Sequence, residues 1–111
     1  PVAVLELTDL GCATSSLRKR AWQVDGRPVH HLVDPRTGSS AVSGLRSVTV
    51  LDTDTARAEV WSKSLLIAGW SRIAQLSEEK ELPAFWVDDT GRLGASAVMR
   101  DYIIWTADHV H

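Results

Sequence analysis

Residues 46–69 read RSVTVLDTDTARAEVWSKSLLIAG, and the change of pattern inside this stretch decides the fold class. Over 46–51, valines alternate with serine and threonine, as in a strand with one buried face. From Asp54 to Ala68 the apolar residues recur at spacings of three and four, which is typical of a helix packed against a core. We therefore predict a strand followed by a helix, whose buried stripe contains Ala58, Trp61, Leu65 and Ala68.

The rest of the chain supplies further strands on both sides of this unit. We expect strands at 2–7, 21–24, 28–33, 85–87, 95–99 and 102–105, and a second helix at 71–79. Asp25-Gly26 predicts a hairpin over residues 21–33, because a type I′ turn needs positive φ at both central positions. Thr53 or Thr55 is expected to cap the first helix, and Gly69 to end it. The order predicts an α+β fold, a mainly antiparallel sheet with helices packed on one face.

Composition narrows the function classes. The chain has 111 residues, with 12 Lys and Arg against 14 Asp and Glu, so its net charge of -2 leaves no basic excess for nucleic acid. Its longest apolar stretch, residues 65–70, is far shorter than the roughly 20 residues of a membrane-spanning helix. The single cysteine, Cys12, is expected as an ordinary thiol in a strand or at a strand end. The five tryptophans are expected in core or interface packing.

The densest polar cluster runs from His30 to Gly38 and reads HHLVDPRTG. Imidazole, carboxylate, guanidinium and hydroxyl groups leave the end of one expected strand together, and such loops commonly carry sites. From spacing alone, an Asp-Pro turn that caps its own amides is the favoured explanation of the cluster. Because neighbouring strand residues point to opposite faces, only one of His30 and His31 can face a given site.

Residues 31–38, HLVDPRTG, resemble the signature of the ApbE flavin transferases, which are FAD:protein FMN transferases. The resemblance continues in order through residues 13–16 (ATSS), 25–27 (DGR), 47–50 (SVTV) and 58–63 (AEVWSK). It implies a single domain over residues 1–111 that is similar to the C-terminal portion of that fold, without its upstream flavin-binding part. It also implies that FMN passes from FAD to a Thr or Ser hydroxyl of an acceptor flavoprotein, with release of AMP.

The same resemblance implies roles for individual residues. His31 matches the family's usual candidate for the catalytic base, and its ordinary pKa suits it to accept a proton near neutrality. Asp34 would orient His31 or a loop amide, Thr37 would contact phosphate, and Ser15 would offer a hydroxyl to FAD. These groups are expected near the first half of the 54–68 helix, within one ligand's span of Glu59. For Arg36 two roles remain possible, a contact with phosphate and a surface ion pair.

Three positions depart from the family pattern. Ser16 stands where the family has glycine, and Glu59 and Lys63 stand where it has the aspartate and threonine that bind metal. A protonated lysine has no lone pair for Mg²⁺, which prefers oxygen ligands. The alternatives are a metal site that keeps Glu59, an ordinary exposed Glu-Lys pair along the helix, and a site where Lys63 replaces the metal. The third predicts that Mg²⁺ does not bind at Glu59 and that Lys63 neutralises the FAD diphosphate.

Three functions compete at this point. The first is an enzyme portion, either a fragment of a longer transferase or a reduced family member. The second is a non-catalytic flavin- or partner-binding module that kept the fold and lost the metal. The third is a structural domain that pairs with a second copy of itself. The expected ligand and partners are FAD and an acceptor flavoprotein.

Overall fold

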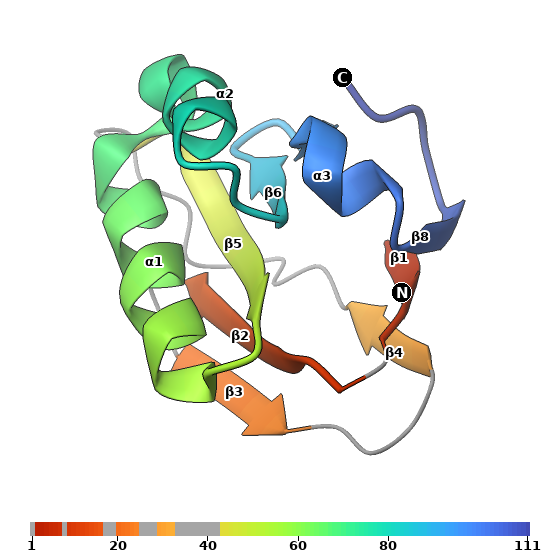
Figure 1. Ribbon diagram of the computed structural model, residues 1–111. Helices are drawn as coiled ribbons and strands as arrows, with labels where there is room; N and C mark the ends of the chain where they lie inside the picture. The colour runs from red at the N-terminus through yellow and green to blue at the C-terminus, as the bar shows by residue number, and fades with distance from the viewer. Residues whose placement is uncertain (1, 8, 17–19, 25–28, 33–42) are drawn as a thin grey trace.

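The computed structural model describes residues 2–7, 9–16, 20–24, 29–32 and 43–111, of which 20–24 and 29–32 are described as backbone. The elements follow in the order β1 (Ala3–Glu6), β2 (Gly11–Ser16), β3 (Arg20–Val24), β4 (Val29–Leu32), β5 (Leu45–Asp52), α1 (Thr55–Ala68), α2 (Trp70–Glu79), β6 (Ala84–Asp88), β7 (Leu93–Ala95), α3 (Ala97–Arg100) and β8 (Ile103–Thr106). Helices and antiparallel strands are both present, which confirms the α+β class (Figure 1).

Within the described residues the strands form two antiparallel sheets. The larger has the order β3-β2-β5-β6-β7, and the smaller has the order β4-β1-β8. The hairpin expected over residues 21–33 is therefore wrong, because β3 pairs with β2 and β4 pairs with β1. The turn expected at Asp25-Gly26 lies outside the described residues. The signal failed because β3 and β4, which flank this segment, belong to different sheets.

Two hydrophobic cores cover the two faces of the five-stranded sheet. On one face, α1 and α2 contribute Ala58, Leu65, Leu66 and Ile73 to a core with Ala13, Val48 and Val50. On the other face, Ala3 and Leu5 of β1 pack with Cys12, Leu51, Phe85 and Met99. Strand residues alternate between the cores, as Cys12 and Ala13 do on β2. The molecule is thus layered as helices, five-stranded sheet and three-stranded sheet (Figure 1).

The α1 helix begins and ends at clear signals. Asp54 is its N-cap, since the carboxylate accepts hydrogen bonds from the N–H groups of Ala56 at 2.9 Å and Arg57 at 3.4 Å. The expectation of Thr53 or Thr55 as the cap was wrong by one residue. Gly69 ends the helix as predicted, with φ of 88° and its N–H donating to the carbonyl of Leu65 at 3.1 Å. Positive φ suits glycine because it has no Cβ.

The predicted inner stripe of α1 is confirmed for Ala58, Trp61 and Leu65, whereas Ala68 is half-buried and lies outside the core between the helices and the sheet. Ala58 and Leu65 are fully buried, and Trp61 is half-buried against the same core. Two other tryptophans, which were expected in core or interface packing, are not in the core. Trp70 is 65% exposed and Trp105 is 49% exposed. Cys12 is buried on β2, which confirms the expectation of a strand thiol.

One expected strand is a helix. Residues 95–99 were predicted as a strand, but β7 ends at Ala95 and α3 follows over Ala97–Arg100. The reason is Ser96, whose buried hydroxyl accepts hydrogen bonds from the N–H groups of Met99 at 3.3 Å and Ala84 at 3.0 Å. This side chain caps the short helix and ties it to β6.

Candidate functional site

Glu59 and Lys63 lie one turn apart on α1, which packs against β2 and β5. Glu59 is half-buried and Lys63 is exposed. The lysine ammonium is therefore open to solvent and to a ligand arriving at the helix.

The first-turn amides of α1 are already occupied. Asp54 caps them, and Asp52, the last residue of β5, accepts a hydrogen bond from the Asp54 N–H at 2.9 Å. Burial acts to raise the pKa of Asp52, but hydrogen bonds from Arg57 and Asp54 and the Arg57 charge outweigh it and lower that pKa. A phosphate would meet two carboxylates at this end of the helix. The region around Lys63, in the middle of α1, is more favourable for a phosphate than this end of the helix.

Ser15 is held inside the protein. It lies on β2 and is 1% exposed, and its hydroxyl is 2.7 Å from that of Ser62 on α1. Ser62 is fully buried and also donates to the carbonyl oxygen of Glu59 at 2.9 Å. Sequence reasoning missed Ser62, although one signal could have found it. It lies four residues after Ala58 and three before Leu65, so it is a polar residue within the buried stripe of α1.

His31 lies on β4 in register with Val4, in the three-stranded sheet. His30 is in register with Leu5, which is fully buried. Strand β1, the neighbour of β4, packs on the face of the five-stranded sheet that α1 does not cover. Asp34, Arg36 and Thr37 lie outside the described residues. The expected cluster of His31, Asp34 and Thr37 near Glu59 stays a prediction.

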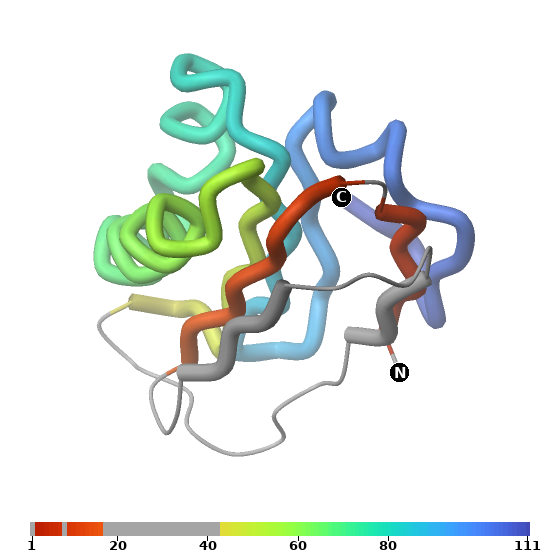
Figure 2. The backbone as a smooth tube through the Cα atoms, turned by 60° about the horizontal axis from the view of Figure 1, so that its bottom comes forward, coloured from red at the N-terminus to blue at the C-terminus, as the bar shows by residue number. Residues whose placement is uncertain are grey.

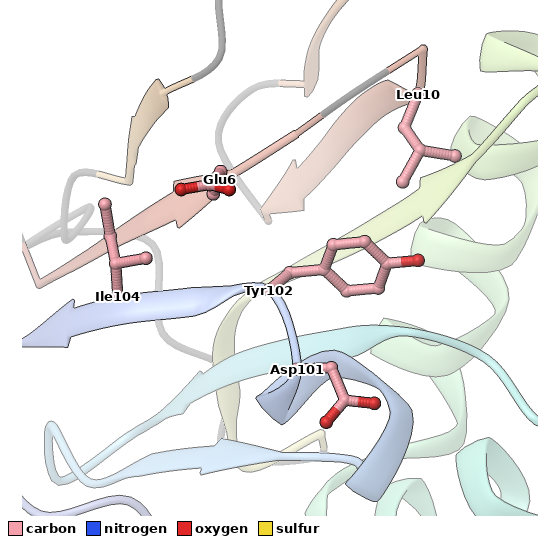
Figure 3. A pocket seen from close by; sticks show the side chains of 5 residues that line it. All are labelled: Glu6, Leu10, Asp101, Tyr102 and Ile104. Atoms are coloured by element: carbon pink, nitrogen blue, oxygen red, sulfur yellow. The ribbon is translucent and has the colours of Figure 1, made fainter.

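The described surface also has hollows away from these residues. One of about 320 Å³ is lined by Glu6, Leu10, Asp101, Tyr102 and Ile104, with the Tyr102 ring across its middle (Figure 3). Two others, of about 360 and 230 Å³, share Trp70, Asp88 and Arg92 as lining residues. These three hollows contain no residue that the sequence analysis assigned to the site.

A metal centre would need several oxygen, nitrogen or sulfur ligands at one place. Among the residues that the structure describes, no three His, Cys, Asp or Glu side chains gather closely enough to hold a metal ion. At Glu59 the side chain one turn further along is a lysine, whose ammonium repels a cation. The described donor set there does not fit Mg²⁺. Within the same residues, no helix is long and apolar enough to cross a membrane.

Flavin transferases are among the solved structures that share this fold. The crystal structure of Pseudomonas stutzeri flavinyl transferase ApbE in its apo form is 26% identical, with a TM-score of 0.64, and covers 89% of this chain and 31% of its own. The flavin transferase ApbE from Vibrio cholerae is 27% identical, with a TM-score of 0.58, and covers 84% of this chain and 30% of its own. The fold defined here is that of the flavin transferases.

The sequence comparison agrees. The model of the ApbE family matches residues 1–86, and the chain belongs to the ApbE family. An FAD:protein FMN transferase of Klebsiella pneumoniae (strain 342) is 27% identical over 89 residues, which are 80% of this chain and 25% of that relative. The chain thus spans about a quarter of the length of such curated relatives. The resemblance seen in residues 31–38 is confirmed at the level of the family.

Proposed function

We propose that this chain forms part of an FAD:protein FMN transferase, corresponding to the C-terminal portion of the longer relatives. The observation that supports it most is the family match over residues 1–86, which includes the HLVDPRTG segment. The reaction moves the FMN phosphoryl group. The oxygen of a Thr or Ser hydroxyl on an acceptor flavoprotein bonds to the FMN phosphorus, the bond to the AMP phosphate breaks, and AMP leaves.

Such a transfer depends on positioning and on neutralising phosphate charge. His31 takes the proton from the acceptor hydroxyl, Asp34 orients His31, and Thr37 donates to a phosphate oxygen. Lys63 neutralises the diphosphate as a compact point charge, and Glu59 holds the ammonium in position. The exposure of Lys63 and its separation from Glu59 by one helical turn support these last two roles.

In the family pattern a metal ion neutralises the diphosphate, and here Lys63 takes that task. An ammonium and a divalent cation within a few ångströms of each other repel, so they exclude each other. Flavin binding by the protein is therefore independent of divalent metal. Loss of the lysine charge weakens it.

The test is a titration of the protein with FAD, followed by flavin fluorescence, with and without EDTA. We expect EDTA to leave the affinity unchanged and Lys63→Ala to reduce it about tenfold or more, since a charge-assisted contact contributes about 1.5–3 kcal/mol. Lys80→Ala is the matched control, because Lys80 is also an exposed lysine, at the end of α2. Loss of binding with EDTA, and none with Lys63→Ala, would restore the metal-dependent mechanism.

Release of AMP from FAD, measured in the same samples, separates the enzyme from a binding module. Tight FAD binding without AMP release, even with an acceptor flavoprotein present, would favour the non-catalytic module. The replacement of the family's metal-binding pair by Glu59 and Lys63 is the observation that keeps this second function in view.

A further inference from the structure

Two buried hydroxyl groups join α1 to the sheet beneath it. Ser15 on β2 and Ser62 on α1 are 1% and 0% exposed, and their Oγ atoms are 2.7 Å apart. The residues around them belong to the apolar core between the helices and the sheet, with Ala13, Val48, Ala58 and Leu65 among them. Polar groups in such a place are costly to bury unless they bond each other.

The direction of the hydrogen bonds follows from counting protons. Each serine hydroxyl has one proton to donate. Ser62 uses its proton on the carbonyl oxygen of Glu59, at 2.9 Å. The bond between the two hydroxyls must then run from Ser15 as donor to Ser62 as acceptor. The result is a directed chain from the sheet, through Ser62, to the backbone of Glu59.

This chain ends at the helical turn that carries the proposed diphosphate site. In an α-helix the carbonyl of Glu59 also accepts from the N–H of Lys63, four residues on. Back-bonding by a serine within a helix tilts the carbonyl and bends the helix locally. The Glu59 carbonyl is therefore the point at which Ser62, itself bonded to Ser15 on the sheet, can set the backbone between Glu59 and Lys63.

We infer that Ser15 and Ser62 are positioning residues that fix the relative placement of Glu59 and Lys63 for binding the FAD diphosphate. The inference rests on the proposed function and deepens it. Ser15 then serves the site through Ser62, in place of the direct contact with FAD that the sequence suggested. Ser62 is fully buried and acts through the Glu59 backbone.

The test uses Ser15→Ala, Ser62→Ala and the double variant S15A/S62A. Ser62→Ala leaves the buried Ser15 hydroxyl without its acceptor, whereas Ser15→Ala leaves Ser62 its bond to the Glu59 carbonyl but removes the hydroxyl that donates to it. Both single variants should therefore destabilise the protein, Ser62→Ala more strongly, whereas removing both hydroxyls is nearly neutral. We expect the thermal midpoint to fall in the single variants and to recover in the double variant. We expect the FAD affinity, measured by flavin fluorescence, to fall about tenfold in all three, as for other groups that orient a binding residue.

Ser64→Ala is the matched control. Ser64 is on the same helix and makes the same kind of back-bond, from its hydroxyl to the carbonyl of Val60 at 2.8 Å, but at an exposed place. This variant should keep the FAD affinity. A double variant that binds FAD as the unsubstituted protein does, or one that fails to fold, would overturn the positioning role alone. An unsubstituted protein that does not bind FAD would overturn the proposed function, and the positioning role with it.

Discussion

Arg57 holds the carboxylate of Asp52 with two nitrogens, since Nε is 3.1 Å from Oδ2 and Nη2 is 3.2 Å from Oδ1. Asp52 ends β5, and Arg57 lies in the first turn of α1. The same carboxylate accepts the Asp54 N–H at 2.9 Å. A single side chain thus closes the connection from the central strand to the helix that carries Glu59 and Lys63.

The first prediction concerns pH. Because its hydrogen bonds and the Arg57 charge outweigh burial, Asp52 has a lowered pKa in the folded protein. A carboxyl with a lowered pKa stabilises the fold above its unfolded pKa of about 3.9, and this contribution is lost as pH falls through the folded value. We expect Asp52→Asn to lower the thermal midpoint at pH 7, and the difference from the unsubstituted protein to shrink below about pH 4. A difference that stays constant from pH 7 to pH 3 would contradict this.

The second prediction concerns the N-cap of α1. Asp54→Ala removes the acceptor for two first-turn amides and should destabilise the protein by about 1 kcal/mol in urea unfolding. Thr53→Ala is its control, because the Thr53 hydroxyl only reaches Asp52, at 3.4 Å, and caps no amide. Equal losses for the two variants would show that Asp54 is not the effective cap.

The third prediction concerns a glycine beneath a tryptophan ring. A Cβ on Gly94 would lie 2.1 Å from Nε1 of Trp86, its cross-strand partner on β6. Gly94→Ala must displace the half-buried indole, and should cost about 1–3 kcal/mol, the usual range for overpacking. In a Trp86→Ala background the same substitution should cost much less. Additive losses in that double-mutant cycle would mean that the ring is not what excludes the methyl group.

The fourth prediction concerns His31, the proposed catalytic base. His31→Ala should lower the rate of FMN transfer by about a hundredfold or more, while FAD affinity changes little. The readout is flavin covalently attached to an acceptor flavoprotein, measured against FAD affinity on the same preparation. His30→Ala is the neighbouring control, since adjacent strand residues point to opposite faces. If His30→Ala abolishes transfer and His31→Ala does not, the two histidines exchange roles.

The elements that the sequence predicted correctly are those determined by residues close together along the chain. Periodicity located α1, and Gly69 ended it, because both depend on residues within a few positions of each other. A strand or strand end was expected at Cys12, but the full strand Gly11–Ser16 was not predicted, because glycine and alanine are depleted in strands. The lack of a side chain at Gly11 allows the start of α1 to lie close to β2, because a Cβ on Gly11 would lie 2.3 Å from Oγ1 of Thr55. That requirement comes from tertiary packing.

The candidate site also has features that could be predicted from the sequence and features that depend on tertiary structure. The resemblance in residues 31–38 identified the family, and helical spacing correctly placed Glu59 and Lys63 one turn apart. The contact between Ser15 and Ser62 joins residues 47 positions apart, and no pattern in the sequence encodes that distance. Whether His31 approaches Lys63 depends on how two different sheets are joined, which spacing along the chain does not determine.

The pairing of β1 with β8 has a consequence for the speed of folding. Ala3 lies opposite Thr106 and Val4 opposite Trp105, so a strand near one end of the described chain pairs with a strand near the other (Figure 2). Closing so long a loop costs entropy before any contact compensates for it, and such topologies fold slowly. Helix α1 and its strand β5 are neighbours in sequence and can form early, whereas the three-stranded sheet must wait for residues 103–106. During synthesis the apolar side chains of β1 therefore remain without their β8 partner until residues 103–106 have been made.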